Sequence, residues 1–100
     1  MKGNFKEIIK SDVPVIVDWY AEWCGPCKAM VPILEQLKSE LGEKVKIIKI
    51  DTDQNPELAI EYSIRSIPTI MIFKNGNSLY RESGVKSKEI LTELVEKHSN

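Results

Sequence analysis

Cysteine and histidine are scarce in this chain of 100 residues, which has two cysteines and one histidine, His98. A structural zinc site commonly takes four Cys or His ligands, so this composition disfavours zinc. Two cysteines are also too few to cross-link a small secreted scaffold. We therefore expect neither a bound metal nor an organic cofactor, and we turn to the chemistry of the cysteines themselves.

An excess of either charge is missing as well. The 14 Lys and Arg residues nearly balance the 15 Asp and Glu residues, so the formal net charge is −1. No large positive field is available to hold a phosphate backbone, and we expect no nucleic-acid partner. The 42% hydrophobic and 29% charged fractions are typical of one globular domain, which we expect to span residues 1–100.

Long apolar runs are absent. The longest, at residues 15–17 and 70–73, are far shorter than the roughly 20 residues that cross a bilayer. Residues 1–7 include an acidic residue and lack the apolar stretch of a secretory signal. We therefore expect a cytoplasmic protein without a membrane partner.

The pattern of apolar residues predicts an α/β order of elements. β-Branched and apolar runs predict strands at residues 13–20, 45–51, 69–74 and 78–82. Apolar residues three and four apart predict helices near residues 5–10, from 26 to 42, from 55 to 62 and from 87 onward. The first two long strands, joined by a helix, should be parallel, and Asn75-Gly76 predicts an antiparallel hairpin.

Several residues predict how the helices begin and pack. Asn55 and Ser87 are expected to cap the helices that follow them, and Pro32 to kink the long helix without ending it. The apolar stripe of the last helix is expected to comprise Ile90, Leu91, Leu94 and Val95.

Both cysteines lie in one segment, Cys24-Gly25-Pro26-Cys27, between a predicted buried strand and a predicted helix. Residues three apart at a helix start have Cβ atoms about 5–6 Å apart, so a disulfide can open and close with small adjustment. The unpaired amides there favour a thiolate and lower the pKa of Cys24. We predict that Cys24 is the nucleophile and that Cys27, expected to be less exposed, resolves the mixed disulfide.

Other interpretations of the cysteine pair are weaker. A purely structural bridge across three residues removes little entropy from the unfolded chain, because the loop that it closes is so short. Cysteines buried only for packing do not need Gly-Pro between them. A reversible dithiol is therefore favoured.

Asp18 interrupts an apolar strand, and burial there would raise the pKa of its carboxyl group toward neutrality. Such a group can take a proton from the Cys27 thiol, directly or through one water. The alternative is an aspartate hydrogen-bonded at a strand end. Lys49, in the next predicted strand, is a candidate partner of this carboxylate.

Two further positions each have an ordinary alternative. Trp23, beside the first cysteine, either shields the thiolate and offers a contact face or fills the core. Pro68 stands at the entrance of a predicted strand, where a residue without an N–H is tolerated. A cis bond before it is plausible, but the base rate of about 5–6% for such bonds does not establish one.

Taken together, residues 17–28, 53–56, 64–69 and 73–76 resemble the thioredoxin family. The resemblance covers nearly the whole chain, and Trp-Cys-Gly-Pro-Cys followed by Ile-Pro-Thr and a hairpin is a specific combination. It implies the thioredoxin fold, a three-layer α/β/α sandwich around a mixed sheet. Only residues 1–4 remain for the usual first edge strand, so we expect four main strands.

The resemblance also implies roles. Cys24 would attack a protein disulfide, Cys27 would resolve it, and Asp18 with Lys49 would assist the second step. The bond before Pro68 would be cis and face the dithiol. The implied substrate-binding residues are Trp23, Gly25, Pro26, Ile67, Pro68 and Gly84.

The implied function is that of a monomeric protein-disulfide reductase. It would act on client proteins with disulfides and be recycled by a thioredoxin reductase-type donor. Pro26 favours a reducing member, because isomerase-like relatives typically carry histidine there. Tyr20, Trp19 and Ser66 differ from the residues usual at their positions and bear on partner choice. The alternatives are a binding subunit that clamps a partner whether or not its thiols react, and an oxidant or isomerase.

Overall fold

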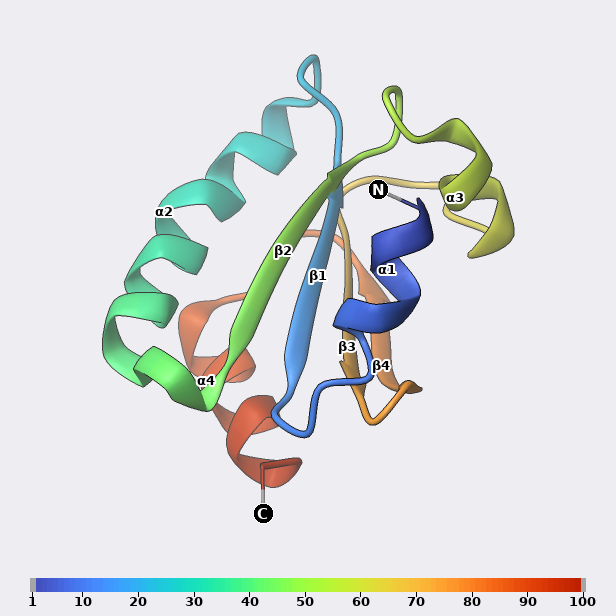
Figure 1. The fold of residues 1–100 in the computed structure, drawn as a ribbon. Helices are drawn as coiled ribbons and strands as arrows, with labels where there is room; N and C mark the ends of the chain where they lie inside the picture. The colour runs from blue at the N-terminus through green and yellow to red at the C-terminus, as the bar shows by residue number, and fades with distance from the viewer. Residues whose placement is uncertain (1, 100) are drawn as a thin grey trace.

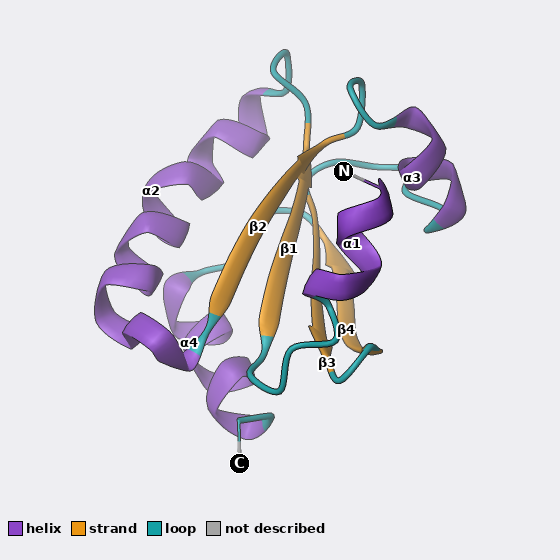
Figure 2. Ribbon diagram, in the orientation of Figure 1, coloured by secondary structure: helices purple, strands orange, loops and turns teal. Residues whose placement is uncertain are grey.

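The structure, a computed structural model, describes residues 2–99 of the chain. In chain order its elements are α1 (Lys2–Ile8), β1 (Val15–Tyr20), α2 (Gly25–Leu41), the 3-10 helix η1 (Gly42–Lys44), β2 (Lys46–Asp51), α3 (Pro56–Glu61), β3 (Thr69–Lys74), β4 (Asn77–Ser83) and α4 (Lys88–Lys97). Figure 1 shows their arrangement, and Figure 2 separates helices, strands and loops by colour.

The four strands form one mixed sheet in the order β2-β1-β3-β4. β1 and β2 are parallel, as predicted, while β3 is antiparallel to both β1 and β4. Helices α1 and α3 lie on one face of the sheet, and α2 and α4 lie on the other (Figure 1). The expected three-layer α/β/α architecture with four strands is confirmed.

The central strand β1 is buried on both faces and divides the core in two. Val15, Val17 and Trp19 pack with residues of α1 and α3. Ile16 points to the opposite face and packs with residues of α2 and α4. Asp18 and Tyr20 are two and four residues beyond Ile16, so they lie on the same face of the sheet as Ile16, the face that α2 covers.

The described residues before β1 form a helix and contain no strand. Residue 1 lies outside the described residues. Helix α1 begins earlier than the predicted helix near residues 5–10 and ends at Ile8. Phe5 within it and Ile9 just after it are both buried. Strand β2 is therefore an edge of the sheet.

Three local predictions are confirmed. Helix α2 runs through Pro32 as one element, so the proline does not end the helix, and the kink stays a prediction. Asn75 and Gly76 have φ values of 53° and 83° and connect β3 to β4 as a hairpin. The Ser87 side chain accepts a hydrogen bond from the amide of Ile90 and caps α4.

Two local predictions are wrong. The Asn55 side chain does not cap α3, because its amide group instead donates to the carbonyl oxygen of Asp51 at 3.0 Å. Ile90 is 47% exposed and does not join the buried stripe of α4, since it lies in the first turn, at the border of the covered face.

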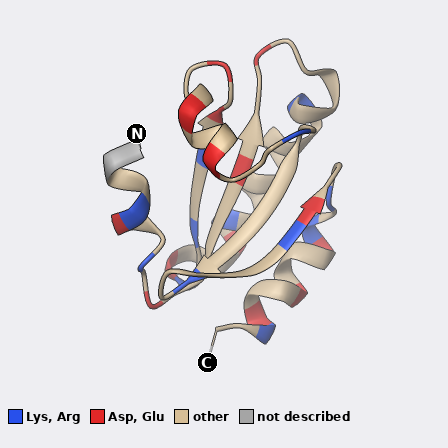
Figure 3. Cartoon of the chain, turned by 90° about the vertical axis from the view of Figure 1, so that its right-hand side faces the viewer, with Lys and Arg blue, Asp and Glu red and all other residues tan. Residues whose placement is uncertain are grey.

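Acidic and basic positions are interspersed along the described chain (Figure 3). Within residues 2–99, no helix combines the length and apolar character needed to cross a membrane.

Candidate active site

The two cysteines lie where the chain leaves β1 and enters α2. Cys24 is the N-cap residue of α2, with φ −87° and ψ 111°, and Cys27 lies in the first turn. Pro26 is tolerated between them because the first helical amides have no partner within the helix. The two sulfurs form a disulfide, with Cα atoms 5.3 Å apart. The dithiol is thus held at the N-terminus of a 17-residue helix.

A hydrogen bond distinguishes the two sulfurs. The amide of Cys27 donates to the Sγ atom of Cys24 at 3.1 Å. Amides and the dipole at a helix N-terminus stabilise negative charge, so a Cys24 thiolate would be favoured here. The prediction that Cys27 is less exposed is wrong for this disulfide form: both residues are 3% exposed, because the bond holds them together.

The loop before β3 meets the dithiol. The Ile67–Pro68 peptide bond is cis, as the resemblance implied. The carbonyl oxygen of Ile67 lies 3.9 Å from Cys24 Sγ, and the Ile67 side chain packs against the two cysteines. The backbone of Ile67 is therefore at the edge of the redox centre.

Gly84 lies beside this loop. Its φ is +95°, and its amide donates to the carbonyl oxygen of Pro68 at 2.8 Å. The hydroxyl groups of Ser66 and Ser83 are 2.8 Å apart and add a second link between the same two segments. Ser83 was not predicted as a site residue, since nothing in its local sequence distinguishes it from any polar strand end.

Trp23 does not fill the core, because it is 72% exposed. Its indole Nε1 donates to the Oδ2 atom of Asp53 at 2.9 Å, which orients the ring beside the dithiol. Asp53 follows β2 directly, at the same end of the sheet as the loop after β1. Sequence reasoning missed Asp53 as a site residue. Its position directly after β2, a strand expected to be parallel to β1, was the available signal that it lies near the loop after β1.

Asp18 is fully buried, and neither of its carboxylate oxygens has a hydrogen-bond partner among the described residues. Burial raises the pKa of this carboxyl group to about 6, although the positive charge of Lys49 opposes the rise. The alternative of a strand-end aspartate satisfied by hydrogen bonds is not what the described residues show. A buried carboxyl group with a pKa of about 6 is suited to proton exchange near neutral pH.

Lys49 is the register partner of Asp18 on the neighbouring parallel strand, but no ion pair joins them in the described part of the chain. The Lys49 Nζ atom lies 5.0 Å from the centroid of the Tyr20 ring. The expected pairing is therefore corrected: Lys49 acts on Asp18 through its field and not through a direct contact.

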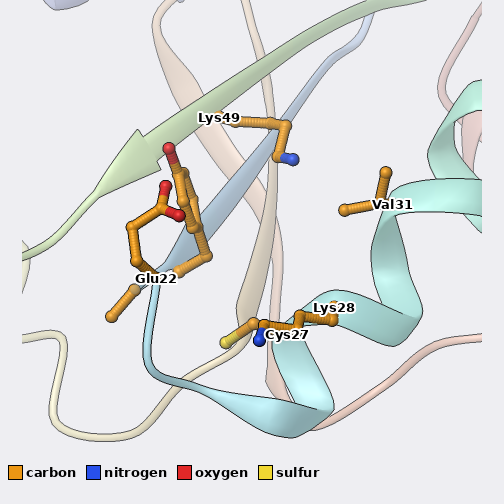
Figure 4. A pocket seen from close by; sticks show the side chains of 7 residues that line it. Glu22, Cys27, Lys28, Val31 and Lys49 are labelled. Atoms are coloured by element: carbon orange, nitrogen blue, oxygen red, sulfur yellow. The ribbon is translucent and has the colours of Figure 1, made fainter.

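A hollow of about 100 Å³ lies next to the disulfide (Figure 4). Lys49 reaches it from β2, while Cys27, Lys28 and Val31 reach it from α2. Its remaining lining residues are Tyr20, Ala21 and Glu22.

Residues 2–99 hold no group of three or more His, Cys, Asp or Glu side chains arranged to bind a metal ion. The structure thus brings together the two cysteines and Ile67, with Gly84 hydrogen-bonded to Pro68. Lys49 lines the hollow beside Cys27 and stands opposite Asp18 in the strand register.

Residues 1–97 match the family model described as Thioredoxin. The chain belongs to the thioredoxin family. It is 49% identical over 98 residues to the thioredoxin of Rickettsia conorii, covering 97% of this chain and 93% of that one. It is 49% identical over 88 residues to the thioredoxin of Bacillus subtilis, covering 88% of this chain and 85% of that one.

Solved thioredoxin structures agree with this assignment. The X-ray structure of Fasciola hepatica thioredoxin superposes with a TM-score of 0.87 at 33% identity, covering 97% of this chain and 93% of that one. The oxidised mitochondrial thioredoxin 3 of Saccharomyces cerevisiae gives a TM-score of 0.85 at 30% identity, covering 96% of this chain and 89% of that one. Together with the paired cysteines, family membership makes this chain a thiol-disulfide oxidoreductase, a dithiol reductase of disulfide-bearing substrates.

Proposed function

We propose that this thioredoxin is a general protein-disulfide reductase in which Cys24 attacks and Cys27 resolves. The observation that supports this order is the hydrogen bond from the Cys27 amide to Cys24 Sγ at the N-terminus of α2. The same amide would stabilise a Cys24 thiolate in the reduced protein. Cys27 Sγ has no comparable donor in the described structure.

The reaction balances as two exchanges. The Cys24 thiolate forms a bond to one sulfur of a client disulfide, whose other sulfur leaves as a thiolate. The Cys27 thiolate then forms a bond to the Cys24 sulfur, and the second client sulfur leaves. The client gains two electrons and two protons, and the dithiol becomes the disulfide seen here. A separate thioredoxin reductase-type enzyme returns the two electrons.

Asp18 is the proposed proton acceptor in the second exchange. Cys27 must lose its proton to become a nucleophile, and the Asp18 carboxylate is buried without a competing hydrogen bond among the described residues. A pKa of about 6 leaves this group mostly ionised at neutral pH yet still basic enough to bind a proton. Lys49 is the proposed modulator of that basicity.

The client-binding surface is proposed to surround the sulfurs. The free edge of the Ile67 backbone would pair with an extended client segment, in the manner of strand addition. Trp23 would offer its exposed ring to apolar client side chains, while Gly84 leaves room beside Pro68. The remaining members of this surface are Gly25 and Pro26.

We propose that residues 1–100 act as a single domain and as a monomer in the cytoplasm. The near-zero net charge supports the absence of nucleic acid and membrane surfaces among its partners. The two sheet faces are each covered by two helices of the same chain, which supports independent folding.

The test is reduction of insulin disulfides, with dithiothreitol as the electron source. The wild-type chain should accelerate the reaction, and a double variant with both cysteines changed to serine should not. The exposed Trp23 also suits a binding subunit, the second candidate function. If the double variant retained full activity, or if the wild type had none while still binding client proteins, the reductase proposal would fail.

A further inference from the structure

The ammonium group of Lys49 is held by an aromatic ring and not by a carboxylate. We infer that Tyr20 is a positioning residue whose ring keeps the Lys49 charge in the hollow beside Cys27, close enough to act on Asp18 but not paired with it. This inference deepens the proposed function, because it rests on Asp18 as the proton acceptor of the second exchange.

The strand geometry makes this arrangement possible. Asp18 and Tyr20 are two residues apart on β1, so both point to the face covered by α2. Lys49 stands opposite Asp18 in the parallel register with β2. Its four-carbon side chain spans the step from that position to Tyr20, where Nζ lies 5.0 Å from the ring centroid.

The distance identifies the interaction. A cation within about 6 Å of an aromatic centroid is attracted by the negative face of the ring. Lys49 has no ion pair and no hydrogen bond among the described residues, so the Tyr20 ring is the group that holds its charge. Both side chains line the hollow next to Cys27, where Figure 4 shows Lys49 entering from β2.

Other charged groups face the same region. Asp51 and Glu22 lie close enough to Tyr20 to raise the pKa of its hydroxyl group, after the larger effect of burial. From α2, the charged groups that line the hollows shared with Lys49 are Lys28, Glu35 and Lys38. In this structure none of the carboxylates comes close enough to Lys49 for an ion pair.

The consequence concerns the proton acceptor. A lysine paired directly with Asp18 would occupy the carboxylate oxygens and oppose their protonation. A lysine released to solvent would be screened more strongly and would act less on the buried carboxyl group. Held by Tyr20, Lys49 leaves the two oxygens free and still moderates the effect of burial on Asp18.

The experiment is a carbon-13 NMR titration of the Asp18 carboxyl group in the oxidised protein, in which the cysteines do not titrate. The variants are Tyr20→Phe, Tyr20→Leu, Lys49→Met and the double variant Tyr20→Leu/Lys49→Met. Tyr20→Phe retains the ring and should leave the Asp18 pKa unchanged. Lys49→Met should raise that pKa, Tyr20→Leu should raise it by no more than Lys49→Met does, and the double variant should raise it no further than Lys49→Met alone.

Tyr20→Met is a second ring-free variant, for use if the leucine variant does not fold. A Tyr20→Leu or Tyr20→Met protein with the wild-type Asp18 pKa, or a lowered one, would overturn the inference, as would additive effects in the double variant. A Tyr20→Phe protein that behaves like Tyr20→Leu would also overturn it, because the hydroxyl group and not the ring would then matter. Since no reaction is followed, this result is independent of whether Asp18 acts in the exchange.

Discussion

The carbonyl oxygen of Ile67 lies 3.9 Å from the Sγ atom of Cys24, although 43 positions separate them in the chain. The sheet explains this proximity. β1 and β3 are antiparallel neighbours, and Trp19 near the end of β1 stands opposite Thr69 at the start of β3. The loop that leaves β1 and the loop that enters β3 therefore emerge at the same edge, and the dithiol meets there the backbone that we propose to bind clients.

The order of attack gives a trapping prediction. A Cys27→Ser variant should form a stable mixed disulfide with client proteins, because Cys24 can attack but no second thiol can release the client. Non-reducing gel electrophoresis after incubation with oxidised clients should show the adduct, and dithiothreitol should remove it.

The matched control is Cys24→Ser, which retains the second cysteine in the first turn of the same helix. It should accumulate no adduct. If Cys24→Ser trapped clients while Cys27→Ser did not, the assignment of the two cysteines would be reversed.

The proposed proton acceptor gives a kinetic prediction. In the wild type, the rate of the second exchange should rise with pH through about 6, as Asp18 becomes ionised. Asp18→Asn should remove that dependence and slow the second exchange about 100-fold at pH 7, the lower end for general base catalysis. Stopped-flow fluorescence separates the two exchanges, and equal rates in both proteins would show that Asp18 is structural.

The same carboxyl group gives a stability prediction. Burial raises its pKa from 3.8 to about 6, so the folded state binds the proton more tightly than the unfolded state. The resulting contribution to the free energy of unfolding is fully present below pH 4 and is lost as pH rises through about 6.

Asn at position 18 cannot titrate. The stability of Asp18→Asn relative to wild type should therefore increase between pH 4 and pH 7, by roughly 2 kcal/mol. Urea unfolding at both pH values measures this difference. A constant difference, or one of opposite sign, would contradict a buried and unpartnered carboxyl group.

The exposed ring of Trp23 gives a client-binding prediction. Trp23→Ala should raise KM for an insulin-like client about tenfold with little change in kcat, as expected for an exposed aromatic contact residue. Ile60→Ala is the matched control, because Ile60 is 77% exposed on α3 and is not among the proposed client-binding residues. Equal effects of both substitutions on KM would remove Trp23 from the client surface.

The backbone of Gly84 gives a second stability prediction. Its φ of +95° is strained for a residue with a side chain, so Gly84→Ala should lower the free energy of unfolding by about 1–3 kcal/mol. Gly25→Ala is the control, since a Cβ atom there meets nothing within 4 Å and no positive φ is needed. Thermal unfolding that ranks the two variants in the opposite order would contradict this account of Gly84.

Sequence reasoning succeeded where a local pattern has one physical meaning. A cysteine pair at a helix start, a charge inside an apolar strand and an Asn-Gly turn each predicted what the structure shows at Cys24, Asp18 and Asn75. The roles of these groups in the reaction are still predictions. The apolar run at residues 15–17 also predicted a buried strand, as the structure shows.

Sequence reasoning failed where the outcome depends on groups brought together by the fold. Asp53 and Ser83 were missed because their partners, Trp23 and Ser66, belong to other segments. The side chain of Asn55 could either cap the first amides of α3 or bond to the carbonyl oxygen of Asp51. Only the position of β2, which ends at Asp51, decides between these two partners. The ring of Tyr20 beneath Lys49 likewise depends on strand register.

The most direct test of the central claim is the equilibrium reduction potential of the Cys24–Cys27 pair against glutathione, read from the thiol content. A reductase should have a potential near that of its family, about −270 mV, so it should remain largely oxidised in a glutathione buffer poised at about −200 mV. A pair that is fully reduced in that buffer, as for an oxidant near −120 mV, or one that never gains two thiols under dithiothreitol, would contradict the account.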